Sequence, residues 1–130
     1  MPDRVLNVLL VEDDPDDVFL LRDMLAGSPG AALELTHAPR LSAALELIQA
    51  GGLDAALLDL SLPDSQGMET FERVHAAAPD LPVVVLTGLN DEWTAVEVVQ
   101  KGAQDYLVKG QVQGPLLVRS LRYAIERQRN

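Results

Sequence analysis

Short, almost uniformly apolar segments constrain the fold of this chain more than any other feature of its sequence. Three of them run through Val5–Val11, Ala55–Leu58 and Val83–Leu86. Strands that are buried on both faces have this composition, and they occur in parallel sheets that helices cover on both sides. Right-handed crossovers then predict an α/β fold: a doubly wound, flavodoxin-like, five-stranded parallel sheet with strand order 2-1-3-4-5 and helices on both faces. Strands are expected at roughly residues 5–11, 33–37, 54–59, 82–87 and 104–108.

The segments between these strands carry the periodicity and the end signals of helices. In the first of them, Asp14 can cap a helix and Pro15 suits its first position. The segment Gly27-Ser28-Pro29-Gly30 is expected to end that helix. Two phenylalanines, Phe19 and Phe71, lie in apolar helical stripes, so we expect both in the core.

Composition and charge limit the classes of function. The 130 residues suffice for one sizeable core, so residues 1–130 are expected to form a single domain. The chain contains no cysteine, which excludes disulfides and thiolate metal sites. Its net charge of −10 would repel nucleic-acid phosphates, and no apolar stretch reaches the roughly 20 residues that span a bilayer. We therefore expect a cytoplasmic protein that binds neither nucleic acid directly nor a membrane.

Polar residues stand where the predicted strands end. In chain order they are Glu12, Asp13, Asp59, Thr87 and Lys109. The carboxyl ends of parallel strands lie at one edge of the sheet, where ligands bind, so we expect these side chains to meet there. Carboxylates favour a hard divalent cation such as Mg²⁺, whereas an amine and a hydroxyl favour an anion. Together they predict a site for Mg²⁺ and a phosphoryl group.

Taken singly, these residues have simpler structural explanations. Asp59 could cap a helix, although Pro63 delays the next helix and weakens that explanation. Lys109 and Thr87 alone would be an ordinary surface lysine and an ordinary strand residue. Their combination favours phosphoryl transfer to Asp59, because that reaction depends mostly on positioning and electrostatic stabilisation. His37, in contrast, is expected at the surface or a sheet edge, far from the strand ends.

The chain resembles the receiver domain of bacterial two-component response regulators, of the single-domain type, over essentially its whole length. The resemblance rests on the five strand-end residues in order and on the segment from Asp59 to Gly67, with Pro63 in place. Tyr106, three residues before Lys109, matches an aromatic position that changes rotamer on activation. The resemblance implies a phosphorylation-dependent signalling switch. It would not be an enzyme, apart from self-phosphorylation and slow self-dephosphorylation.

The resemblance also implies a phosphoacceptor and a metal site. Asp59 would accept a phosphoryl group from a sensor histidine kinase or a histidine phosphotransfer protein. Asp13, Asp59 and the backbone carbonyl of Ser61 would hold Mg²⁺, with Glu12 acting through water.

Two further residues are implied to carry the signal. Thr87 and Lys109 would bind the phosphoryl oxygens, and Thr87 with Tyr106 would relay the change to the face formed by the fourth helix, the fifth strand and the fifth helix. A downstream protein target would bind that face, on which Trp93 is expected. The sequence leaves the oligomeric state open, a homodimer through the same face included.

The chain departs from the family pattern at two glycines. Gly110 follows Lys109, where the family usually has proline, so we expect a trans peptide bond there. Gly88 follows Thr87 and gives that loop extra freedom.

Three alternatives compete with the switch. The first is a phosphorylation-independent interaction module on the same fold, which the complete set of site residues argues against. The second is a flavodoxin-type FMN protein, whose phosphate loop would stand where this chain has acids. The third is a haloacid-dehalogenase-type phosphatase, which needs a second aspartate where Ser61 stands.

Overall fold

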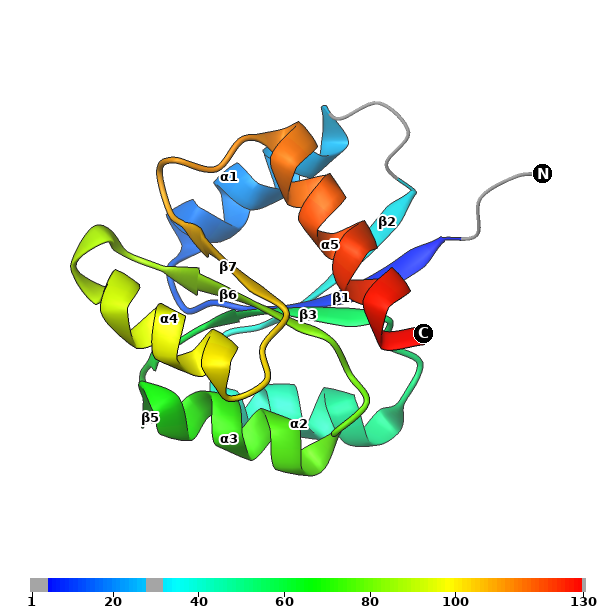
Figure 1. Cartoon of the computed structure of the whole chain (residues 1–130). Helices are drawn as coiled ribbons and strands as arrows, with labels where there is room; N and C mark the ends of the chain where they lie inside the picture. Colours follow the sequence, from blue (N-terminus) through cyan, green and yellow to red (C-terminus); the bar gives the residue numbers. More distant parts are fainter. Residues whose placement is uncertain (1–4, 28–31, 130) are drawn as a thin grey trace.

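The central sheet contains five parallel strands, as the apolar segments predict. The structure, a computed structural model, describes residues 5–27 and 32–129, so Ser28-Pro29-Gly30 of the predicted end of the first helix lies outside the described residues. The sheet's order is β2-β1-β3-β6-β7, which equals the predicted order 2-1-3-4-5 when its strands are counted along the chain (Figure 1). The strands are β1 (Leu6–Val11), β2 (Leu33–Ala38), β3 (Ala55–Asp59), β6 (Val83–Thr87) and β7 (Asp105–Val108).

Helices cover both faces of this sheet, also as predicted (Figure 1). On one face lie α1 (Pro15–Ala26) and α5 (Gly114–Arg129). On the other lie α2 (Leu41–Ala50), α3 (Met68–Ala77) and α4 (Glu92–Gln100), the last preceded by a short 3₁₀ turn at Leu89–Asp91. No helix in the described part of the chain is long and apolar enough to cross a membrane.

The sheet divides the hydrophobic core into two layers. Successive residues of a strand point to opposite faces, so Leu10 packs in the layer of α1 and α5 and Leu9 in the layer of α2, α3 and α4. Phe71 is buried in the second layer, as predicted. The prediction for Phe19 is wrong, because its side chain is 69% exposed. α1 turns Val18 toward the sheet, and the next residue lies about 100° further around the helix and faces solvent.

A small hairpin follows β3, which the sequence did not indicate. Its antiparallel strands are β4 (Ser61–Leu62) and β5 (Ser65–Gln66). In the turn between them, the Asp64 carboxylate accepts hydrogen bonds from the backbone N–H groups of Leu41 (2.8 Å) and Ser42 (2.9 Å). These bonds, that with Leu41 above all, lower the pKa of Asp64 below its usual value. The hairpin therefore caps α2 from a distant part of the chain, and the residue before α2, Arg40, makes no side-chain cap bond.

Gly110 turns the chain after β7. The peptide bond between Lys109 and Gly110 is trans, as expected, and Gly110 has a φ of 85°, in the left-handed region that favours glycine. Lys109 itself is tied to the sheet, because its backbone N–H donates to the carbonyl of Thr87 at 2.8 Å. This turn lets the Lys109 side chain leave the sheet at its carboxyl edge while the backbone runs on to α5.

Candidate functional site

The strand register brings the predicted site residues to one edge of the sheet. Val11 of β1 pairs with Leu58 of β3, so Glu12 and Asp59 both come one residue later. Asp59 in turn pairs with Leu86 of β6, next to Thr87. The parallel ladders thus align positions that are up to 97 residues apart in the sequence, from residue 12 to residue 109. Local apolar runs of matched length are what place these polar residues level with each other.

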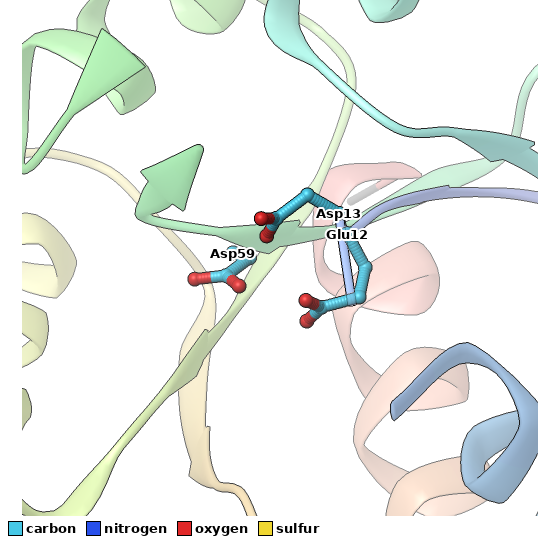
Figure 2. Close-up of side chains that lie close together, drawn as sticks. All are labelled: Glu12, Asp13 and Asp59. Atoms are coloured by element: carbon cyan, nitrogen blue, oxygen red, sulfur yellow. The ribbon is translucent and has the colours of Figure 1, made fainter. Parts of the chain in front are cut away.

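Three carboxylates lie close together at this edge of the sheet. Glu12, Asp13 and Asp59 each offer an oxygen, and these oxygens lie within 4.8 Å of one another. Figure 2 shows the side chains of Glu12 and Asp13 leaving the end of β1 in different directions, both with their carboxylates turned toward Asp59. Glu12 is fully buried and Asp59 is 5% exposed, whereas Asp13 is exposed. Among the described residues, the Asp13 side chain has no hydrogen bond or ion pair, so its oxygens are available to a ligand.

Lys109 supplies positive charge to this group of acids. Its Nζ lies 2.6 Å from Glu12 Oε2 in an ion pair and donates hydrogen bonds to Asp59 Oδ2 (2.7 Å) and Asp17 Oδ2 (3.2 Å). Burial by itself lowers the pKa of Lys109, but the hydrogen bonds and charges of Asp59 and Glu12 outweigh it and raise that pKa above its ordinary value. The ammonium is therefore charged at any physiological pH. Sequence reasoning did not find Asp17, which belongs to the first turn of α1.

Glu12 is a fully buried acid of the site, and its surroundings change its pKa. Desolvation raises its pKa to about 7, with the charge of Asp59 adding to the effect and Lys109 opposing it. The backbone N–H of Asp14 donates to Glu12 Oε1 at 3.1 Å. A carboxylate this deep in the fold depends on a nearby cation to stay ionised.

His37 lies closer to the site than predicted. It is on the edge strand β2, but its Nε2 is 2.6 Å from the backbone carbonyl oxygen of Glu12. The prediction that it would be far from the strand ends is therefore wrong. The reason is the β1–β2 register, which pairs His37 with Leu10, so that its side chain reaches the end of β1.

Asp59 is held through both carboxylate oxygens. Oδ2 accepts from Lys109, as described, and Oδ1 accepts from the backbone N–H of Ser61 at 2.9 Å. The carboxylate opens onto a hollow of about 310 Å³ whose wall includes Thr87, Gly88 and Thr94. Thr87 is 2% exposed, and its hydroxyl donates to the carbonyl of Gly88 at 3.2 Å. A small anionic group on Asp59 would enter this hollow, next to the hydroxyl of Thr87.

Tyr106 lies apart from the acids, on the side of β7 that faces α4. Its hydroxyl donates to Glu92 Oε2 at 2.7 Å, and Glu92 is the first residue of α4. This hydrogen bond, above all, raises the pKa of Tyr106. The structure thus brings Glu12, Asp13, Asp59 and Lys109 together, puts Thr87 at the hollow beside them, and ties Tyr106 to α4.

The family of the chain follows from its match to known sequences. The family model described as "Response regulator receiver domain" matches residues 8–121, which include every residue of the site. The chain belongs to this family.

Similar proteins agree with this assignment. This receiver domain is 32% identical over 104 residues to the transcriptional regulatory protein ZraR of Escherichia coli (strain K12), covering 80% of this chain and 23% of ZraR. It is also 32% identical over 104 residues to the swarming motility regulation protein RssB of Serratia marcescens, covering 80% of this chain and 46% of RssB. The chain therefore spans less than half the length of these curated relatives.

A solved structure shares the fold. The response regulator receiver domain protein from Clostridium thermocellum superposes with a TM-score of 0.83 at 22% identity, over 96% of this chain and 98% of that one. This receiver domain is a signalling domain of two-component response regulators, and its fold is the five-stranded sheet described above.

The acids of the receiver domain fit a divalent metal ion. The three side chains of this group offer carboxylate oxygens, which hard cations such as Mg²⁺ and Ca²⁺ prefer. Asp13 is exposed and unpaired within the described residues, so it can approach an ion while keeping room for water on the ion. The Ser61 backbone carbonyl, predicted as a further ligand, belongs to the residue whose N–H already orients Asp59.

Proposed function

We propose that this receiver domain is a phosphorylation switch in which Asp59 accepts a phosphoryl group in the presence of Mg²⁺. The donor would be a phosphohistidine of a sensor histidine kinase or of a histidine phosphotransfer protein. The observation that carries the proposal is the environment of Asp59: its carboxylate is nearly buried and fixed by Lys109 and by the Ser61 N–H. It also faces a hollow large enough for a phosphoryl group.

In the proposed reaction, a carboxylate oxygen of Asp59 attacks the phosphorus atom in line with the leaving imidazole. The P–N bond of the phosphohistidine breaks as the O–P bond forms, and the histidine leaves as neutral imidazole after it takes up a proton. Lys109 and the Thr87 hydroxyl would bind the phosphoryl oxygens, since both groups can donate to an anion. Bound Mg²⁺, held by Asp13 and Asp59 with Glu12 acting through water and the Ser61 carbonyl as a further ligand, would offset the charge that gathers on these oxygens.

The proposed output begins at Thr87. If its hydroxyl turns to the phosphoryl group, it must give up the hydrogen bond to the Gly88 carbonyl. That change would alter the loop leading to α4, and Tyr106 would then leave Glu92. Exposed apolar side chains lie at the start of α4: Trp93 is 75% exposed, and Leu89, in the 3₁₀ turn before the helix, is 65% exposed. The proposed output face is the one formed by α4, β7 and α5. We propose that a downstream protein binds there.

The test uses a small phosphodonor, so that no partner protein is needed. With acetyl phosphate and Mg²⁺, the wild-type domain should gain the mass of one phosphoryl group, and Asp59→Asn should gain none. Asp80→Asn is the matched control, because Asp80 is an exposed aspartate far from the site at the other end of the sheet. Both variants should keep the wild-type circular dichroism spectrum.

Two results would count against the switch. Labelling of Asp59→Asn at the wild-type level would mean that another residue is the phosphoacceptor. A wild-type domain that takes up no phosphoryl group, yet binds its partner, would favour the alternative of a phosphorylation-independent interaction module.

The same experiment measures self-dephosphorylation. After removal of the donor, the added mass should be lost slowly.

A further inference from the structure

The Lys109 ammonium has one carboxylate partner that the proposed mechanism does not use. Glu12 and Asp59 surround it from the ends of β1 and β3, and Asp17 completes the set from α1. An ammonium group carries three N–H donors, so its capacity matches the three carboxylates around it. Asp17 contacts neither of the other acids in the described contacts and stands outside the group of candidate metal ligands.

The geometry of α1 brings the side chain of Asp17 within reach of Lys109. α1 begins at Pro15, with Asp14 capping it through a hydrogen bond from the Asp16 N–H. Asp17 is therefore in the first turn, where its side chain turns inward and is 29% exposed. Asp16, one residue earlier, is exposed and its side chain has no partner among the described residues. The positive end of the helix dipole stabilises both carboxylates, but only Asp17 reaches the site.

The other two partners of Lys109 are the groups that the phosphoryl reaction changes. Asp59 becomes the covalent acceptor, and Glu12 would turn toward the metal through water. The Lys109 ammonium must then exchange its hydrogen bond with Asp59 for one with a phosphoryl oxygen. Because the four-carbon side chain of lysine is flexible, the ammonium needs another partner to keep its position during this exchange. Asp17 is the partner that neither event consumes. It can hold the ammonium beside Asp59 before, during and after the transfer.

We propose that Asp17 is a positioning residue of this site, which fixes the Lys109 ammonium so that it meets the incoming phosphoryl group. The inference rests on the proposed function, because the phosphoryl group is the anion that Lys109 is positioned to meet. It does not require Asp17 to touch the phosphoryl group or the metal.

The first experiment measures how firmly the ammonium is held by its partners, without phosphorylation. The chain has only two lysines, Lys101 and Lys109, so NMR of the ¹⁵N-labelled ammonium groups gives one signal for each. Lys101 is exposed and serves as the internal reference, whereas the Lys109 ammonium should exchange its protons with water slowly. Asp17→Asn should speed that exchange, and Asp16→Asn, which removes the same charge from the same turn, should not. Equal exchange at Lys109 in both variants would overturn the inference.

The second experiment measures phosphoryl uptake from acetyl phosphate at saturating Mg²⁺. Asp17→Asn should lower the rate by about three- to tenfold, since loss of positioning slows a reaction that depends on it. Asp17→Glu should restore part of the rate, and Asp16→Asn should match the wild type.

The outcomes separate the two proposals. Normal uptake by the wild type and by Asp17→Asn alike would overturn the role of Asp17 and leave the phosphorylation switch intact. No uptake by the wild type would overturn the switch itself, and the role of Asp17 with it. Slower uptake in Asp17→Asn together with faster ammonium exchange, both absent in Asp16→Asn, would support the inference.

Discussion

Glu12 makes the stability of the metal-free domain depend on pH. Its pKa is about 7 in the folded protein against an ordinary value of 4.5, so the folded state holds the proton more tightly than the unfolded chain. This contribution is fully present below the ordinary pKa and is lost as the pH rises through the folded-state pKa. Glu12 therefore lowers the free energy of unfolding at alkaline pH relative to acidic pH.

The variant Glu12→Gln should remove this dependence. Between about pH 5 and about pH 8, the wild type should lose about 1–3 kcal/mol of unfolding free energy relative to the variant. Urea denaturation in the presence of a chelator measures the difference, because a bound cation would keep Glu12 ionised. Curves for the two proteins that run parallel across this range would contradict the assignment of the raised pKa to Glu12.

Lys109 would compete with a bound divalent cation for the same acids. Its ammonium contacts Glu12 and Asp59, two of the three carboxylates that could hold a metal ion. Lys109→Gln removes that positive charge and should raise the affinity for Mg²⁺ by about tenfold, as measured by calorimetry.

Lys101→Gln is the matched control for this charge change. Lys101 is exposed at the end of α4, so its replacement makes the same change in net charge at a place away from the acids. It should leave the affinity for Mg²⁺ close to that of the wild type. If both variants raised the affinity equally, the effect would come from the overall charge of the domain and not from the contacts of Lys109.

At the scale of elements, the hydrogen bond between Tyr106 and Glu92 joins β7 to the start of α4. An ionised Glu92 favours the protonated phenol, which is why the pKa of Tyr106 is raised. Glu92→Gln should therefore lower the pKa of Tyr106 toward its ordinary value. The chain has two tyrosines, so ultraviolet absorbance during an alkaline titration should show one of two transitions moving. Glu97→Gln, an exposed change on the same helix, should move neither.

The elements show which parts of the structure local sequence patterns can predict. Apolar runs and helical periodicity located the strands and their order, because strands buried on both faces leave few topologies. The same patterns missed Phe19, since a single residue in an apolar stripe can point away from the core. They also missed the capping of α2 by Asp64, because that bond depends on how the β4–β5 turn approaches the helix.

The site shows the same division. The polar residues at strand ends could be named because parallel strands bring their carboxyl ends to one edge. Asp17 and His37 could not, because each reaches the site from another element, α1 and β2, at a distance set by packing. The sequence does contain one short-range signal for Asp17: this residue lies in the first turn of a capped helix, close to the acidic pair Glu12 and Asp13. The signal can be recognised only once the structure is known.

At the scale of the whole molecule, the rigid part and the adaptable part are separate. β1, β3 and β6 are almost entirely buried between the two helical layers, so the strands that present Glu12, Asp59 and Thr87 have little room to shift. The loops at the carboxyl edge contain more exposed residues, among them Asp13, Asp64 and Leu89. A change at Asp59 is therefore expected to appear in the loop from Thr87 to α4 and not in the sheet.

The hollow beside Asp59 is walled in part by Asp91 and Thr94, which flank the chain's single tryptophan on the first turn of α4. Trp93 stands out from that turn with three quarters of its surface in solvent, at 75% exposure. Its indole emission will register solvent contact at that one turn, without contributions from other tryptophans. The molecule thus carries its own optical probe, and the arrival of a partner on this helix can be followed without attaching a dye.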